Sequence, residues 1–343
     1  MNERISVFVI NYNGAKVLED TLLCLSGLEY PDYTLSLVDD CSSDNSIGLV
    51  KEKFPDVNII RHPVNKGPNA ARNTAIKASI TNLLLLVDND IKMKPDLLNI
   101  LADVKKRYPN SALCAPVIAY LENPEQIKYG GTSIHYIGAS IIKRGNIKAV
   151  YNKQDPVRAD VVGGGTILVD RAAALKNGLF DEDFRIGWED GDFSYRITMA
   201  GYDCMIVPQA VVLHEKGLKG LNRAYYQIRN RWFFMLKTYS LKTLFLIMPA
   251  LVIYEISLML FMTLRRNLCI YLGANCEVIQ KYGALMKKRK KVQKLRKRPD
   301  REILYSGNFT ASEDVVKKGY QKTLKDLLNL MFNYYWNAVK NYV

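Results

Sequence analysis

LLLLVDND, residues 83–90, is the stretch that decides the fold class of this chain. Five consecutive apolar residues follow a helix-like segment and end in two carboxylates, one residue apart. Such a run is typical of a buried parallel strand, and open α/β sheets bind ligands at the carboxyl ends of their strands. Asp88 and Asp90 can both reach one divalent cation there, because hard cations prefer oxygen ligands. The alternative is a solvated turn, in which Asp and Asn are ordinary residues.

Strand-like and helix-like segments alternate along the first half of the chain. Besides the strand at 83–87, the predicted strands cover residues 5–10, 35–38, 57–60 and 113–119. The predicted helices begin near Lys16 and Ser46 or cover residues 70–78 and 95–108. This alternation predicts an α/β fold with right-handed βαβ units and a mainly parallel central sheet. The less regular interval 120–160 predicts loops and short antiparallel strands.

A glycine triplet, Gly163–Gly165, lies between two strand-like segments. Glycine permits unusual φ values and lets a ligand approach the backbone closely, although a strand bulge explains the triplet equally well. The triplet is not a dinucleotide fingerprint, because the G-x-G-x-x-G spacing and a helix directly after it are both missing.

An acidic cluster surrounds Trp188 at the start of a predicted helix. Acids in a first helical turn often only complement the helix dipole, which is the interpretation for Asp192. A carboxylate beside a large ring can instead act as a general base if it reaches an acceptor hydroxyl, and the pair Glu189–Asp190 is the candidate. His214 follows an apolar run, where a histidine is either structural or a ligand.

The composition is that of a globular chain with a strong basic excess. Its 343 residues are 48% hydrophobic and carry a formal net charge of +14, which fits one large α/β domain plus a basic region. Such an excess suggests an anionic partner: nucleic acid, acidic lipid headgroups or a phosphorylated substrate. The six cysteines form no C-x-x-C pair, so neither a zinc site nor a disulfide framework is indicated, and a reducing cytosol fits best. The first apolar run is too short for a signal peptide and is interpreted as a core strand.

In their order, these segments resemble the inverting GT-A-fold glycosyltransferases of family 2, especially the rhamnosyltransferase-like, membrane-associated members. The motifs that carry the resemblance are NYNG at 11–14, VDDCSSD at 38–44, NKG at 65–67, ARN at 71–73, DND at 88–90, the glycine triplet, WED at 188–190 and His214. The resemblance implies a GT-A fold, the nucleotide-diphospho-sugar transferase fold, for residues 1–215, followed by C-terminal membrane-associated helices.

The resemblance also implies roles for individual residues. The residues that it places at the substrates are Asn11, Tyr12, Asp39, Lys66, Arg72, Asp88 and Trp188. Among these, Asn11 and Tyr12 would line the nucleotide pocket, Asp39 would contact the nucleobase, and Lys66 and Arg72 would lie close to the base or the diphosphate. Asp88, Asp90 and His214 would hold the metal ion. Asp190 would be the general base that accepts the proton, with Glu189 beside it. Asp40 departs from the commoner Asn, which leaves the nucleotide preference open.

The expected chemistry accounts for these residue types. Sugar transfer from a nucleoside diphosphate leaves a diphosphate, and a divalent cation neutralises the developing charge as a Lewis acid. An imidazole ligand favours Mn²⁺, and Mg²⁺ is also compatible. Asp190 would accept the proton of the attacking hydroxyl, and direct displacement would invert the anomeric centre. No covalent nucleophile is then required, and no G-x-S-x-G elbow is present.

The chain changes character after residue 215. Residues 216–240 mix cations and aromatics, which is typical of an interfacial helix. Residues 241–266 are apolar over nearly the length of a bilayer, and cations on both sides favour an in-plane or re-entrant helix over a single span, with a buried soluble helix as the remaining alternative. Residues 267–343 predict a basic, amphipathic helical tail, whose cations at 287–301 are expected at an anionic membrane surface. That run lacks aromatics for base stacking, so no nucleic-acid partner is expected.

The expected function is a metal-dependent inverting glycosyltransferase at the cytoplasmic face of the cell membrane. It would move a hexosyl group from a UDP-, dTDP- or GDP-linked donor to a hydroxyl of a lipid-linked glycan or another cell-envelope acceptor. Two alternatives stay open. One is a polyprenyl-phosphate glycosyltransferase, whose phosphate acceptor needs little help from a base, and the other is a catalytically silent membrane- or nucleotide-binding scaffold. Donor and acceptor identity depend on the shape of the pocket.

Overall fold

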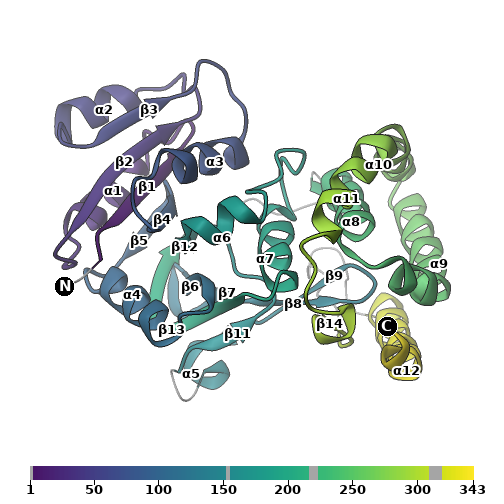
Figure 1. Ribbon diagram of the computed structural model, residues 1–343. Helices are drawn as coiled ribbons and strands as arrows, with labels where there is room; N and C mark the ends of the chain where they lie inside the picture. The colour runs from purple at the N-terminus through teal and green to yellow at the C-terminus, as the bar shows by residue number, and fades with distance from the viewer. Residues whose placement is uncertain (1–2, 152–154, 216–222, 309–318) are drawn as a thin grey trace.

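The computed structural model describes residues 3–151, 155–215, 223–308 and 319–343, and it divides into a part built on one large sheet and a helical C-terminal part (Figure 1). The strands of the large sheet are β1 (Ile5–Asn11), β2 (Tyr33–Asp39), β3 (Asn58–Arg61), β4 (Leu83–Asp88), β5 (Ile91–Met93), β6 (Ser111–Tyr120), β7 (Asn123–Tyr129), β10 (Gly145–Asn146), β11 (Val157–Ala159), β12 (Thr166–Asp170) and β13 (Asp203–His214). The helices of this part are α1 (Leu18–Ser26), α2 (Ser46–Lys53), α3 (Pro68–Ala78), α4 (Leu97–Arg107), α5 (Ile147–Val150), α6 (Arg171–Lys176) and α7 (Glu189–Met199).

The sheet is parallel where the sequence predicts βαβ units and mixed beyond them. Strands β3, β2, β1 and β4 are neighbours in that order and all run parallel. Strand β12 then pairs antiparallel with both β4 and β6, and β13 pairs parallel with β6. The register places Asn11 opposite Asp39 and Ile10 opposite Asp88, so the polar ends of β1, β2 and β4 meet at one edge. The prediction of an α/β fold with a mainly parallel sheet is confirmed.

Apolar side chains fill both faces of the sheet. Because successive strand residues point to opposite faces, β1 buries Ile5, Val7 and Val9 in the core under α1 and α4, and Phe8 and Ile10 in the core under α3. Strand β4 is buried on both faces in the same way, as the Leu-rich run predicts. The buried strand ends therefore hold the polar edge in a fixed geometry.

The helical part packs against the sheet through a third core. Its helices are α8 (Ala224–Thr238), α9 (Leu241–Leu264), α10 (Leu268–Gln280), α11 (Tyr282–Gln293) and α12 (Tyr320–Val339). A small sheet, in the order β14 (Leu304–Tyr305), β8 (Thr132–His135), β9 (Ala139–Ile142), lies between the two parts. Here Tyr136 stacks on Trp336 of α12 at 4.8 Å, and its hydroxyl donates to the carbonyl of Phe332 at 2.9 Å. The C-terminal helix thus packs on the segment that joins β8 to β9.

The cations of α8 are buried, which corrects the prediction of an interfacial cationic helix at 216–240. Arg229, Arg231 and Lys237 are each at most 4% exposed. They pair with Glu277, Glu255 and Asp181, respectively, inside the protein. Residues 216–222 of that predicted segment lie outside the described residues. Burial of charge is tolerated here because each cation has a partner.

The basic run at 287–301 is divided between the interior and the surface. Lys288 pairs with Asp181 and Asp183, Arg296 pairs with Asp300, and Arg298 pairs with Asp203. The contacts of Lys288 and Arg298 attach the tail to the sheet-based part, and the cations of all three residues are neutralised within the protein. The cations of the run that stay exposed are Lys287, Lys290, Lys291, Lys294, Lys297 and Arg301.

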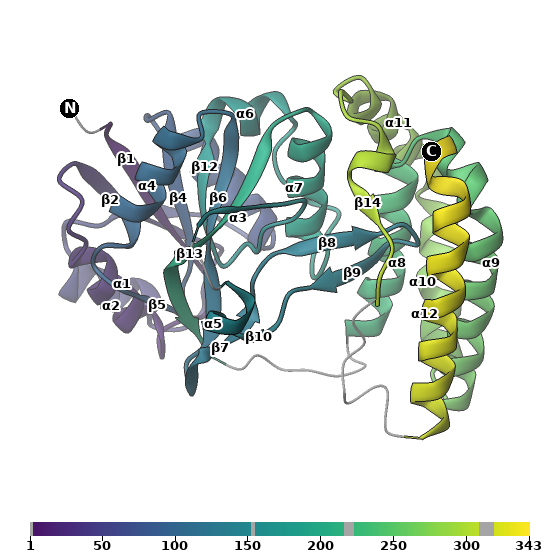
Figure 2. The ribbon, with the colours of Figure 1, turned by 90° about the horizontal axis from the view of Figure 1, so that it is seen from below.

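Among the described residues, α9 is the one helix whose length and composition would allow it to cross a membrane. Its most apolar window is only 17% buried. The exposed large apolar residues of α9 are Leu241, Phe245, Met248, Val252, Ile253, Ile256, Met259, Leu260 and Leu264. Glu255, the one acid of this helix, points inward to Arg231 and to the hydroxyl of Tyr271, so it does not interrupt the outer face. Figure 2 shows α9 and α12 side by side at the end of the molecule away from the N-terminus.

Candidate active site

Polar side chains from three neighbouring strand ends form a buried cluster. The Asn11 amide donates to Asp39 Oδ1 at 2.9 Å, and the Asn89 amide donates to Asn11 Oδ1 at 2.7 Å. Asp39 is fully buried, and its Oδ2 also accepts from the backbone of Ser42 at 3.0 Å. Tyr12 lies beside this cluster and is 52% exposed. The structure thus brings three predicted nucleotide-site residues to one edge, while the contact of Asp39 with a nucleobase stays a prediction.

Asp40 has a role within the protein that explains why it is not Asn. Its two oxygens accept from the backbone N–H groups of Lys66 at 2.9 Å and Gly67 at 2.7 Å, and Oδ1 also lies 2.7 Å from His62 Nδ1. An Asn would offer one oxygen to these two backbone donors, whereas a carboxylate serves both. Asp40 therefore closes the loop before α3, and the side chain of Lys66 on that loop is exposed.

Arg72 connects the predicted metal motif to the predicted base. Its guanidinium donates to Asp88 Oδ1 at 2.9 Å and lies 3.9 Å from Asp190 Oδ1. Arg72 is only 4% exposed, because α3 carries it into the core, where it lies over the ring of Phe180. Despite this burial, the neighbouring carboxylates Asp88 and Asp190 raise the pKa of Arg72, so it stays charged. A fixed cation therefore lies between the two acids.

The glycine triplet brings the backbone close to Asp190. The N–H of Gly164 donates to Asp190 Oδ2 at 2.8 Å, and a β-carbon on Gly164 would lie 1.9 Å from Asp190 Oδ1. That Oδ1 atom is buried and has no hydrogen-bond partner in the described residues. Burial raises the pKa of Asp190, which Arg72 partly offsets. Burial and the adjacent Asp190 charge raise the pKa of Glu189 to about 7. The group that approaches the glycine backbone closely is therefore the Asp190 side chain, and one of its oxygens has no hydrogen-bond partner among the described residues.

The residues of the predicted metal site come from two segments that the sheet places together. Strand β13 pairs with β5, opposing His214 to Ile91, and this brings His214 Nδ1 to 3.6 Å from Asp90 Oδ2. Burial raises the pKa of Asp90, while His214 lowers it. Nδ1 of His214 is buried without a hydrogen-bond partner in the described residues. In the part of the chain that the structure describes, no three such side chains are close enough to hold a metal ion.

The donor set nevertheless fits a divalent cation. Two carboxylates one residue apart and an imidazole nitrogen with no hydrogen-bond partner face the same region. Carboxylate and imidazole together suit Mn²⁺, and carboxylates suit Mg²⁺. The structure therefore brings Asp90 and His214 close together, while a metal ion held by Asp88, Asp90 and His214 stays a prediction.

The turn before α7 has an unusual backbone. Gly187 has φ +77° and Trp188 has φ +70°. A bulky residue with positive φ costs about 1–3 kcal/mol and persists only when its surroundings hold it. The Trp188 ring stacks on Phe234 of α8 at 4.8 Å, which provides one such support. The predicted base motif therefore starts from a strained turn.

Asp192 corrects its sequence-based interpretation. It is fully buried, and it pairs with Arg196 at 2.9 Å and with Lys237 at 2.7 Å. Complementing the helix dipole is therefore not its main role, since it joins α7 to α8. The partner Lys237 is far away in sequence, so the acidic pattern alone does not predict this pair.

Sequence reasoning missed several residues that shape the site. The sequence marks Asn89 only as the middle residue of the acidic motif, yet its side chain joins the end of β4 to Asn11. Lys128 of β7 interacts electrostatically with Asp90, and burial lowers its pKa. Asn73 donates to the carbonyl of Phe180 at 2.9 Å and so fixes the loop before Trp188. Asn73 belongs to the ARN motif, which is a signal that could have found it, whereas nothing local marks Lys128.

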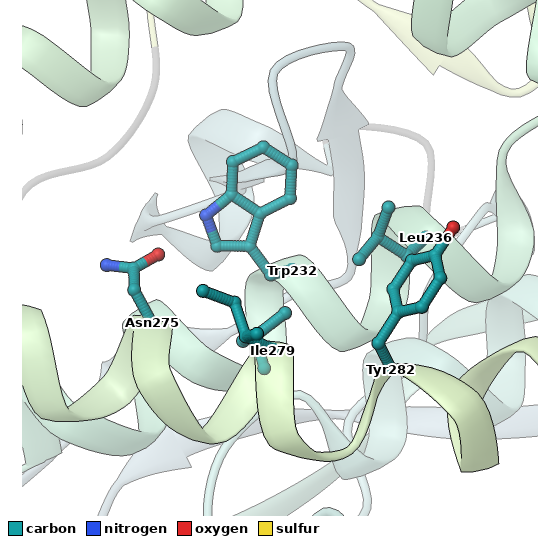
Figure 3. A pocket seen from close by; sticks show the side chains of 6 residues that line it. Trp232, Leu236, Asn275, Ile279 and Tyr282 are labelled. Atoms are coloured by element: carbon teal, nitrogen blue, oxygen red, sulfur yellow. The ribbon is translucent and has the colours of Figure 1, made fainter.

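An apolar groove lies apart from these residues, between α8, α10 and α11 (Figure 3). It has a volume of about 410 Å³. The side chains that line it are Trp232, Leu236, Asn275, Val278, Ile279 and Tyr282. The indole nitrogen of Trp232 is buried without a hydrogen-bond partner in the described residues.

Comparison with solved structures identifies the fold. A solved structure of GalNAc-T7 with UDP, GalNAc and Mn²⁺ has a TM-score of 0.56 at 18% identity, covering 70% of this chain and 48% of that chain. The mannosyltransferase of Pyrobaculum calidifontis in complex with GDP-Man and Mn²⁺ has a TM-score of 0.52 at 16% identity, covering 86% of each chain. The fold is therefore of the GT-A type, as the resemblance implies.

The sequence comparisons identify the family. Residues 6–173 match the family described as Glycosyl transferase family 2. The N-acetylglucosaminyl-diphospho-decaprenol L-rhamnosyltransferase of Mycobacterium tuberculosis is 24% identical over 240 residues, covering 63% of this chain and 77% of the relative. The poly-beta-1,6-N-acetyl-D-glucosamine synthase of Staphylococcus epidermidis is 27% identical over 219 residues, covering 61% of this chain but 51% of the relative. The chain contains a glycosyltransferase family 2 domain and is a glycosyltransferase.

Proposed function

We propose that the protein is a metal-dependent, inverting glycosyltransferase that moves a sugar from a nucleoside-diphosphate donor to a hydroxyl of a lipid-linked glycan or another cell-envelope acceptor. The observation that carries the proposal is the position of Asp190. One of its oxygens is fixed by Gly164 at 2.8 Å, while the other is buried and has no hydrogen-bond partner among the described residues. A carboxylate held in this way is suited to accept a proton from a hydroxyl that enters the site.

In the proposed mechanism Asp190 removes the proton of the acceptor hydroxyl as its oxygen attacks the anomeric carbon. The raised pKa of Asp190 makes it a stronger base than an exposed aspartate. Arg72, between Asp190 and Asp88, keeps the carboxylate oriented and limits that rise. Attack from the face opposite the leaving diphosphate inverts the anomeric centre.

The donor would bind at the carboxyl ends of β1, β2 and β4. Asp88, Asp90 and His214 would hold a divalent cation there, and such a cation supplies Lewis-acid neutralisation of the leaving diphosphate. Lys128, beside Asp90, adds a second positive charge on the same side. The complexes of the two similar structures, one with UDP, GalNAc and Mn²⁺ and the other with GDP-Man and Mn²⁺, support a donor site of this kind.

A lipid-linked acceptor agrees with the outer surface of the helical part. The outward side of α9 is apolar, and Lys287, Lys290 and Lys291 of α11 are exposed, as is Lys294 directly after it. This combination supports an α9 that lies in the plane of an anionic membrane surface, because its inner side is tied to α8 by Glu255 and Arg231. The rhamnosyltransferase relative, whose name includes a diphospho-decaprenol acceptor, supports an acceptor of this class.

The experiment that tests the proposal measures transfer of labelled sugar into solvent-extractable lipid by the wild type and by Asp190→Asn. General-base catalysis contributes about 10²- to 10⁴-fold, so we expect the variant to lose at least about 10²-fold in kcat while donor affinity is unchanged. Weakened nucleotide binding with normal turnover would refute the role of Asp190. Full activity of the variant would instead favour the polyprenyl-phosphate alternative, because a phosphate acceptor arrives already deprotonated.

A further inference from the structure

The turn that delivers the general base is held from the helical part of the molecule. Gly187 and Trp188 both have positive φ, and α7 with Glu189 and Asp190 begins directly after them. The carbonyl of Trp188 accepts from the N–H of Asp192 in α7 at 2.7 Å, whereas the carbonyls of Ile186 and Gly187 need other partners. Figure 1 shows α8 on the side of α7 away from the sheet, and the two helices are in contact through Tyr195 with Phe234 and Asp192 with Lys237.

We propose that Asn230 of α8 is a positioning residue for the general base, because its side-chain amide holds the turn at 186–188. The amide nitrogen of Asn230 donates to the carbonyl of Ile186 at 3.1 Å and to that of Gly187 at 2.7 Å. Asn230 is fully buried, so water does not compete for these contacts. Both protons of one amide are thus used on two consecutive carbonyls of the strained turn.

The orientation of this amide is fixed by its neighbour. Arg229 Nε donates to Asn230 Oδ1 at 2.9 Å, and since a guanidinium only donates, the other end of the amide must be the nitrogen. Arg229 is itself held by Glu277 of α10 at 2.9 Å and donates to the carbonyl of Asp183 at 2.7 Å. A chain of charged and amide groups therefore runs from α10 through α8 to the catalytic turn.

A second contact from α8 fixes the side chain of the same turn. The Trp188 ring stacks on Phe234, which lies one helical turn after Asn230. Backbone and side chain of the turn are thus both held by one face of α8. If the amide contact is lost, the turn can relax toward ordinary φ values, and Asp190 moves relative to Gly164 and Arg72.

This inference rests on the proposed role of Asp190 as base. The test distinguishes a failure of that role from a failure of the positioning role of Asn230. The test variant is Asn230→Asp, which keeps the shape of the side chain but replaces both donors with an acceptor that repels the two carbonyls. Asn230→Ala is the second variant, which removes the donors without adding charge. Activity is measured as nucleoside-diphosphate release from UDP-glucose, GDP-mannose and dTDP-rhamnose with Mn²⁺ and a bacterial lipid extract.

Gln293 of α11 provides a matched control. Its amide nitrogen donates to the carbonyls of Lys237 at 3.1 Å and Thr238 at 2.8 Å, and its oxygen accepts from Arg296 Nε at 3.0 Å. The chemistry is the same as at Asn230, but the carbonyls belong to the end of α8 and not to the catalytic turn. Gln293→Glu therefore reports the purely structural effect of losing such an amide.

We expect both acidic variants to lower the unfolding temperature, and only Asn230→Asp to lower kcat, by about 10- to 100-fold with the donor KM unchanged. We also expect the acid limb of its pH–rate profile to shift, because the surroundings of Asp190 change. Asn230 variants with kcat within about threefold of the wild type, or an equal kcat loss in Gln293→Glu, would overturn the inference. If Asp190→Asn is fully active while Asn230→Asp is impaired, Asp190 is not the general base. The role of Asn230 in holding the turn at 186–188 would then still stand.

Discussion

Gly164 has no side chain because the carboxylate of Asp190 occupies the space that a β-carbon would need. The distance from that position to Asp190 Oδ1 is 1.9 Å, far inside van der Waals contact. The next glycine, Gly165, is different, since a β-carbon there would meet Ile118 and Ile91 at 3.5 Å, which is ordinary contact. An alanine is therefore expected to disturb the site at Gly164 but not at Gly165.

We predict that Gly164→Ala displaces Asp190 and lowers kcat by about 100-fold, the cost of a misplacement of roughly 1 Å. Gly165→Ala, its neighbour, should keep kcat within a few-fold of the wild type. The measurement is the turnover of both variants beside their thermal unfolding curves. Equal activity of the two alanine variants would show that Gly164 is not needed for the placement of Asp190.

The sequence predicts which side chains lie close together better than it predicts their individual contacts. Arg72, Asp88 and Asp190 are correctly brought together, since motifs at strand ends and helix starts converge on one edge of the sheet. The partners of Asp40 and Asp192 were not predictable, because His62 and Lys237 come from distant segments and no local pattern marks them. Motifs indicate which residues gather, whereas tertiary packing decides which of them pair.

Among the elements, the alternating strands and helices were predictable and the role of the tail was not. Predicted strands such as 5–10 and 83–87 match β1 and β4 within one residue, because runs of buried apolar residues have few alternatives. The cations of α8 follow the pattern of an interfacial helix, but they point inward to acids of α9, α10 and the loop at 181–184. Composition alone cannot tell an outward-facing cation from one that a distant carboxylate neutralises.

The apolar outer side of α9 leads to a prediction about membrane binding. Phe245 and Leu260 are 79% and 55% exposed, so replacing both with Glu should disturb the fold little. Each residue buried in a lipid surface would contribute about 1.5–3 kcal/mol, so we expect the double variant to lose at least about 100-fold in affinity for phosphatidylglycerol vesicles in co-sedimentation. Ile80→Glu is the matched control, because Ile80 is 83% exposed on the sheet-based part. Equal vesicle binding by all three proteins would rule out α9 as the membrane contact.

At the scale of the whole molecule, Asp181 joins the sheet-based part to two helices of the helical part, α8 and α11. It pairs with Lys237 of α8 at 2.5 Å and with Lys288 of α11. Burial alone would raise the pKa of Asp181, but the two lysines together lower it below its usual range. A carboxyl with a lowered pKa in the folded state contributes stability above its unfolded pKa of about 3.9 and loses it as the pH falls below that value.

We therefore predict that the unfolding temperature of the wild type falls between pH 5 and pH 3 more steeply than that of Asp181→Asn. At pH 7 the variant should be less stable by about 1–3 kcal/mol, because Lys237 and Lys288 lose a charged partner while Lys237 keeps Asp192. Asp20→Asn is the control, since its ion pair with Lys92 is largely exposed and should contribute little. Parallel pH profiles for the wild type and Asp181→Asn would contradict a role of Asp181 in joining the two parts.

The central claim is that this glycosyltransferase uses a nucleotide sugar and a divalent cation held by Asp88, Asp90 and His214. The most direct measurement is nucleoside-diphosphate release from UDP-, dTDP- and GDP-sugars by detergent-solubilised protein, with Mn²⁺, with Mg²⁺ and with EDTA, beside Asp90→Ala. We predict release from one donor class that requires the cation and is lost in Asp90→Ala, while the variant keeps the unfolding temperature of the metal-free wild type. Release that persists in EDTA and in the variant would contradict the metal site, and no release from any donor would contradict the proposed reaction.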